Sequence, residues 1–163
     1  MSDLARFLPL SNRPRRDESG TSRDWAARVA EVAAAVEAVA DRGDGPHPEA
    51  ESALAAVRDL ALTSAARHAA GRRVRVRELR AVLLAAWRAS DALGAPLELD
   101  PVVTGAVALD LAAGARLPIR AVIRDRTLVA SDAGWRLGGG EELVGTAREI
   151  VTFLAGEGPV PGA

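Results

Sequence analysis

The chain has 163 residues and a net charge of −1, from 21 basic and 22 acidic side chains, so no global field favours nucleic acid or an anionic membrane. It contains no lysine, which excludes Schiff-base chemistry and a P-loop lysine, and no cysteine, which excludes disulfides, thiolate metal sites and thiol nucleophiles. No apolar run approaches the roughly 20 residues that span a bilayer, and the N-terminus lacks a signal-peptide pattern. We therefore expect a soluble, cytoplasmic protein.

Composition along the chain predicts an α+β fold in four parts. A bundle of about four helices precedes a small antiparallel β-meander, which a C-terminal helix closes. Pro, Gly and mixed charge without an apolar period are typical of a flexible arm. The predicted parts are a flexible N-terminal arm at residues 1–20, a helical bundle at 21–114, a small β-sheet plus helix module at 115–157 and a tail at 158–163.

Four segments have the apolar spacing of amphipathic helices and end at capping or breaking residues. They are approximately residues 22–41, 48–71, 77–93 and 101–114. Thr21 or Ser22 is the expected cap of the first helix. Asp100 followed by Pro101 is a cap-plus-first-turn signal, and Gly94 is expected to end the third helix in the left-handed conformation.

The module after these helices is predicted to contain two β-hairpins. Residues 119–124 and 127–131 form the first pair, and residues 135–137 and 142–144 form the second around three glycines. Thr146 begins a T-x-x-E capping box, which predicts the start of the last helix.

The two histidines, His47 and His68, match none of the spacings that metal sites use. His68 lies near the end of a predicted helix, where a partly charged imidazole complements the dipole, so a structural role is favoured. His47 lies between two prolines and is expected to be a solvated loop residue. We predict no catalytic residue, no metal ligand and no cofactor.

Arginines supply the candidate anion sites. One cluster could pair with phosphates or an anionic ligand, although a solvated face with internal ion pairs is favoured; its members are Arg72, Arg73, Arg75, Arg77 and Arg80. Strand alternation would put Arg120 and Arg124 on one face. Asp132 lies at a predicted strand junction, where a role in the turn is favoured over ligand binding.

The segment TLVASDAGWRLGGGEELVGTAREIVTFLAG resembles the C-terminal module of the maleylpyruvate isomerase-like, mycothiol-dependent proteins. Upstream, AAWRASDALG resembles the helix that precedes this module in the family, and the resemblance covers residues 79–156. The matching residues are Ser131, Asp132, Gly134, Trp135, Val144, Gly145, Ala147, Leu154 and Gly156, with Trp87, Ala92, Leu93 and Gly94 upstream.

The resemblance implies a DinB-like helical bundle that holds a divalent metal with three histidines. In this chain Ala85 stands at the position of one of those histidines, and Arg88 stands at the acidic position that follows. The resemblance therefore implies a metal-free relative without the family's metal-activated thiolate.

These observations favour a non-catalytic module that binds a small apolar or anionic ligand, or acts through protein contacts, with a cleft near Trp87 and Trp135. The expected ligand-binding residues are Trp87, Arg88, Arg120, Arg124, Asp132 and Trp135. One alternative is a metal-independent enzyme that uses Arg and Asp groups in a helix–sheet cleft, and another is a protein-interaction subunit. A small molecule is the expected partner and a homodimer stays open, whereas neither a membrane nor nucleic acid is expected.

Overall fold

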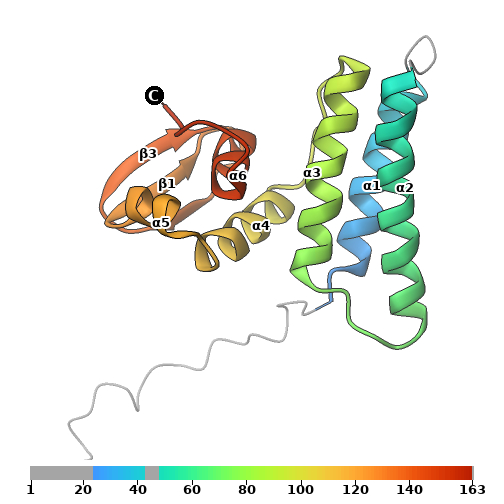
Figure 1. Cartoon of the computed structure of the whole chain (residues 1–163), viewed down its shortest axis with the longest axis horizontal. Helices are drawn as coiled ribbons and strands as arrows, with labels where there is room; N and C mark the ends of the chain where they lie inside the picture. The colour runs from blue at the N-terminus through green and yellow to red at the C-terminus, as the bar shows by residue number, and fades with distance from the viewer. Residues whose placement is uncertain (1–23, 43–47, 163) are drawn as a thin grey trace, which may run out of the picture.

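The computed structural model describes residues 24–42 and 48–162. It has an α+β fold with a small mixed sheet, as the sequence predicts at the level of fold class. Helices α1 (Ala26–Ala40), α2 (Pro48–Ala69) and α3 (Val76–Leu93) lie side by side (Figure 1). The predicted N-terminal arm and His47 lie outside the described residues.

Helix α1 begins later than the sequence pattern suggests. It begins at Ala26, and the carboxylate of Asp24 accepts a hydrogen bond from the Ala26 backbone N–H at 3.0 Å. Asp24 therefore precedes the helix and satisfies a free backbone donor of its first turn. The caps proposed at Thr21 and Ser22 lie outside the described residues.

Local capping signals are confirmed at three other helix ends. Helix α4 (Pro101–Ala113) begins where Asp100 accepts from the Val102 N–H at 2.8 Å. Helix α6 (Ala147–Ala155) begins with the predicted capping box at Thr146. Gly94 ends α3 with a φ of 63°. Helix α4 packs against both α3 and α6, so the helical part and the sheet part share one core.

The predicted strand at residues 119–124 is wrong, because this segment forms helix α5 (Leu117–Ile123). Ile119, Val122 and Ile123 pack against the core at helical spacing, whereas a strand would put Ile119, Ala121 and Ile123 on one face. Pro118 fits the first turn of this helix, where no backbone N–H is needed. The first predicted hairpin therefore does not exist.

The sheet is not the predicted antiparallel meander. Strand β1 (Arg126–Ala130) lies in the centre, antiparallel to β2 (Arg136–Gly138) and parallel to β3 (Glu141–Gly145). Strands β2 and β3 lie on opposite sides of β1, so the predicted pairing between them is wrong. The chain moves from one edge of the sheet to the other through Gly138, Gly139 and Gly140.

This crossover passes against the beginning of β1, and the close approach explains its glycines. A Cβ on Gly138 would lie 2.3 Å from the carbonyl oxygen of Arg126, and a Cβ on Gly140 would lie 1.9 Å from that of Asp125. Gly138 and Gly140 also have positive φ angles of 104° and 116°. Only glycine fits both the space and the backbone conformation there.

The chain returns to the sheet after α6. Pro161 is buried, and a Cβ on Gly145 would lie 2.8 Å from its Cβ, so this segment packs against the end of β3. Among the described residues, no single helix has the length and apolarity to cross a membrane; the pair α4 and α5, bent by 114°, meets that test by length and composition alone.

Candidate ligand-binding pockets

Two hollows lie where α3 meets the sheet module. The first, which we call the Trp87 groove, has a volume of about 630 Å³ and lies at the N-terminal ends of α4 and α6. Trp87, Asp132, Thr104 and Arg148 are among its lining residues. The structure therefore brings two of the predicted ligand-binding residues, Trp87 and Asp132, to one place.

Trp87 contributes little accessible surface to this groove. Its side chain is 5% exposed, and the guanidinium carbon of Arg148 lies 5.8 Å from the ring centroid. Arg148 also pairs with Asp91 on α3. The arginine thus covers the indole and joins α6 to α3 by a cation–π contact and an ion pair.

Asp132 holds the beginning of α6. Its Oδ1 accepts a hydrogen bond from the Ala147 backbone N–H at 2.7 Å. A carboxylate at a helix N-terminus satisfies a free donor and complements the helix dipole. One of its oxygens is therefore used within the fold, by a helix that begins 15 residues later in the chain.

Trp135 does not line the Trp87 groove. Its Nε1 donates to the hydroxyl of Thr104, 3.0 Å away, and its ring lies against Gly105 of α4. A Cβ on Gly105 would lie 3.3 Å from Trp135 Cδ1, so the small residue leaves space for the indole. Trp135 anchors the sheet module on α4.

The predicted arginines lie elsewhere. Arg120 and Arg124 belong to α5 and its C-terminal end, where they line a separate hollow of about 430 Å³. Arg88 is exposed and its guanidinium binds both carboxylate oxygens of Glu157 at 2.9 Å. The six predicted ligand-binding residues therefore do not form a single site.

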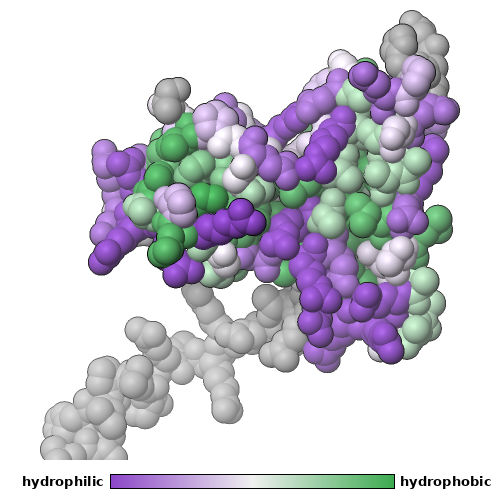
Figure 2. All heavy atoms as spheres, in the orientation of Figure 1, coloured by the Kyte–Doolittle hydropathy of each residue, from purple (hydrophilic) through white to green (hydrophobic). Residues whose placement is uncertain are grey.

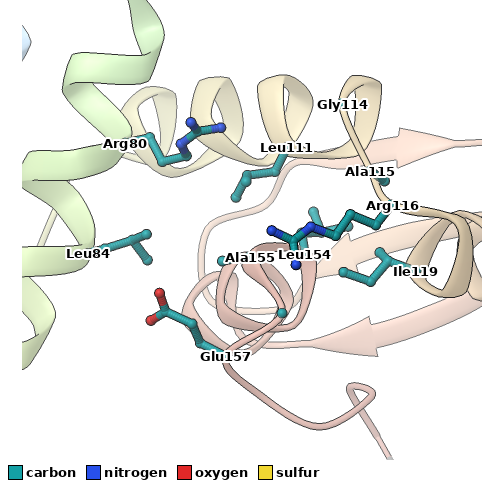
Figure 3. Close-up of a pocket in the computed structure, with 11 residues that line it drawn as sticks. Arg80, Leu84, Leu111, Gly114, Ala115, Arg116, Ile119, Leu154, Ala155 and Glu157 are labelled. Carbon is teal, nitrogen blue, oxygen red and sulfur yellow. The ribbon is translucent and has the colours of Figure 1, made fainter.

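The second hollow is the Arg116 pocket, with a volume of about 320 Å³ at the C-terminal ends of α4 and α6 (Figure 3). Its walls carry the apolar side chains Leu84, Leu111, Ile119 and Leu154. The charged lining residues are Arg80, Arg116 and Glu157. Figure 3 shows the guanidinium of Arg116 extending from the start of α5 into the space between α4 and α6.

The charges around this pocket are not all compensated. Arg80 Nη1 lies 3.0 Å from Asp110 Oδ2, and Glu157 is held by Arg88, which lies outside the pocket. For the guanidinium of Arg116, by contrast, the described part of the chain supplies no hydrogen-bond or ion-pair partner. The pocket thus has one free positive charge above an apolar wall.

Arg116 is not among the residues that the sequence predicts for a site, because the wall of its pocket comes from α3, α4, α5 and α6. The sequence does contain a weak signal for a corner at Arg116, since Gly114 ends one helix and Pro118 marks the first turn of the next. An arginine between these two residues lies at a corner, at the N-cap position of α5.

Of the two histidines, only His68 lies among the described residues, near the C-terminal end of α2. His68 Nδ1 lies 3.1 Å from Asp24 Oδ2, which links the end of α2 to the residues before α1. Within residues 24–42 and 48–162, no three His, Asp or Glu side chains are grouped closely enough to hold a metal ion. No known family model matches the chain, and neither a curated protein nor a solved structure is significantly similar to it.

Proposed function

We propose that this protein is a non-catalytic, metal-free relative of the maleylpyruvate isomerase-like family that binds a small anionic molecule with an apolar body. The observation that carries the proposal is the free guanidinium of Arg116 above the apolar wall of its pocket. The Trp87 groove is a poorer anion site, because Glu98 and Asp132 line it and Arg148 is already paired.

A carboxylate is the simplest ligand head group for this pocket. It can accept two parallel hydrogen bonds from one guanidinium, a stronger arrangement than a single neutral hydrogen bond. The apolar body of the ligand would lie against Leu111, Ile119 and Leu154 and gain roughly 25 cal/mol for each Å² of apolar surface removed from water. The volume of about 320 Å³ suits a short aliphatic or aromatic acid.

A binding role is favoured over the alternative of a metal-independent enzyme. That alternative needs Arg120, Arg124 and Asp132 in one cleft, but Asp132 lies in the Trp87 groove and the two arginines lie on α5. In the Arg116 pocket, Glu157 is engaged by Arg88 and Arg80 by Asp110. Arg80 and Glu157 are thus held by ion pairs within the fold. Of the charged side chains that line this pocket, Arg116 is the one available to bind a ligand.

Membership of this family is part of the proposal. The residues that match the family motif have structural roles, which supports the interpretation of this module as an inherited scaffold. Asp132 holds the start of α6, and Trp135 anchors the module on α4. Ala85, which stands at a metal-histidine position, is buried in the core. Native mass spectrometry of protein purified without chelator is expected to show no stoichiometric metal, and a bound transition metal would overturn the metal-free assignment.

The ligand proposal is tested with a panel of hexanoate, benzoate and phenylacetate against the corresponding neutral amides. Chemical-shift perturbation in ¹H–¹⁵N spectra should show that the acids bind at millimolar concentration or below and the amides do not. Arg116→Gln should weaken binding by about tenfold or more, as expected for loss of a charge-assisted pair. Arg120→Gln, at an exposed arginine of α5, should leave binding unchanged. Binding that is equal in the two variants would refute the proposed site.

A second candidate, the interaction module, is favoured by an exposed apolar groove of about 400 Å³ between α1 and α2. Leu62 at this groove is 69% exposed, beside small side chains such as Ala30 and Ala61. Small side chains would let the helices of a second copy approach closely. Light scattering would show a dimer that Leu62→Glu dissociates if the homodimer is correct, and a monomer at all concentrations would eliminate it.

A further inference from the structure

A strongly basic hollow lies at the end of the bundle where α2 ends and α3 begins. It has a volume of about 610 Å³, and its lining residues are Arg67, Arg72, Arg73 and Arg75. Figure 2 shows hydrophilic side chains gathered over this end of the helices. Neither candidate pocket near the sheet shares a residue with it.

The fold fixes the backbone that carries these arginines. Gly71 adopts a left-handed φ of 71°, and the Arg72 N–H donates to the carbonyl of Arg67 at 3.1 Å, which reverses the chain after α2. Val74 is fully buried, and its carbonyl accepts from the Trp25 N–H at 3.0 Å. Arg73 and Arg75 are exposed on either side of this anchor, so they are presented from a fixed segment.

Little negative charge compensates the four guanidinium groups. Arg67 Nε lies 3.1 Å from Glu78 Oε1, although this buried Nε makes no hydrogen bond of good geometry. The other oxygen of Glu78 accepts from the Arg75 backbone N–H. Among residues 24–42 and 48–162, neither Arg72 nor Arg73 has an acidic partner.

We propose that this hollow, which we call the four-arginine site, binds a polyphosphate group carried by a small molecule. Guanidinium groups bind phosphoryl oxygens in a bidentate manner, and several converging ones favour a ligand with several negative charges over a single carboxylate. All four lining residues are arginine, so a base or hydrocarbon meets no aromatic or aliphatic side chain there. The site therefore recognises the phosphate chain itself. This inference is independent of the ligand proposed for the Arg116 pocket.

Isothermal titration with inorganic triphosphate tests the proposal. Binding should be measurable in low salt and should weaken as salt rises, because phosphate contacts release counterions. The double variant Arg72→Gln/Arg73→Gln should weaken it by about tenfold or more. The control Arg120→Gln/Arg124→Gln removes the same charge from exposed positions on α5 and at its C-terminal cap. It should change affinity by less than about twofold.

Comparison of several ligands in the same titration distinguishes the classes of ligand. ATP should bind as tightly as inorganic triphosphate, and monophosphate should bind more weakly, because the site reads several phosphates and no base. If both double variants lose the same affinity for triphosphate, the loss reflects net charge alone and the proposal is overturned. A short DNA duplex that binds more tightly than triphosphate would also overturn it, by assigning the surface to nucleic acid. Circular dichroism checks that every variant is folded.

Discussion

Trp135 donates its indole N–H to the hydroxyl of Thr104, with 3.0 Å between Nε1 and Oγ1. Thr104 is 4% exposed and itself donates to the carbonyl of Pro101 at 3.1 Å. The hydroxyl therefore serves as acceptor and donor at once, and it joins the sheet module to the first turn of α4. A buried polar group used in this way is costly to disrupt from either side.

Replacing Thr104 by Val should destabilise the protein by about 1–3 kcal/mol, since the indole N–H would lose its acceptor while the side-chain volume is kept. Trp135→Phe removes the donor and should also destabilise. The double variant should cost less than the sum of the two single variants, because they act on the same hydrogen bond. Urea unfolding of all four proteins measures this coupling, and simple additivity would contradict it.

The glycine crossover offers a matched pair of substitutions. Gly140→Ala should be severely destabilising, by about 3 kcal/mol or more, because its Cβ would lie 1.9 Å from the Asp125 carbonyl oxygen at a positive φ. At Gly139 a Cβ meets nothing within 4 Å. Gly139→Ala should therefore stay within about 0.5 kcal/mol of the wild type. Similar melting temperatures for the two variants would contradict the described crossover.

Asp132→Ala should destabilise the protein by about 1 kcal/mol through loss of the hydrogen bond to Ala147. It should leave carboxylate binding in the Arg116 pocket unchanged, because Asp132 lines the other hollow. Glu141→Ala is a suitable control, since this side chain is exposed and its ion-pair distance is 3.7 Å. Thermal unfolding and the same binding titration measure both effects. A loss of affinity without a loss of stability would assign Asp132 to ligand binding.

The stability of the protein in acidic solution should depend on the ionisation of Asp24. The Ala26 N–H lowers the pKa of Asp24 below its ordinary value, opposed in part by burial and helped by the Val74 N–H and His68. A carboxyl with a lowered folded pKa stabilises the protein fully above its unfolded pKa, about 3.9. That contribution is lost as pH falls through the lowered pKa. The stability difference between wild type and Asp24→Asn should therefore shrink as the pH falls below about 4. Urea midpoints measured from acidic to neutral pH test this; a difference that grows in acid would contradict it.

Local signals predicted the elements whose stability is decided locally. Asp100 with Pro101, Thr146 with Glu149, and Gly94 each act within a few residues, and each defines a helix end. Segment 117–123 was mispredicted because its apolar residues fit an alternating and a helical period almost equally well over so short a length. Its partner in the core decides between them.

Non-local relationships account for the remaining differences. The pairing of β3 with β1 depends on a crossover at the end of another strand, which no pattern within β2 or β3 reveals. Arg88 was predicted to bind a ligand, but its charge is taken by Glu157, 69 residues away. Arg116 was not predicted, because its importance comes from side chains on four helices that surround it.

The segment after α6 has a further consequence for how the protein behaves at high concentration. An open sheet edge is a template on which other chains add strands and aggregates grow. Here β2 is only three residues long and carries an exposed arginine, Arg136. At the end of β3, Pro161 packs against Gly145, and Gly162 lies against the carbonyl of Val144. Both edges of this small sheet are thus protected against pairing with a strand of another chain. A variant truncated before Pro161 should therefore form fibrils under conditions in which its helices are still folded.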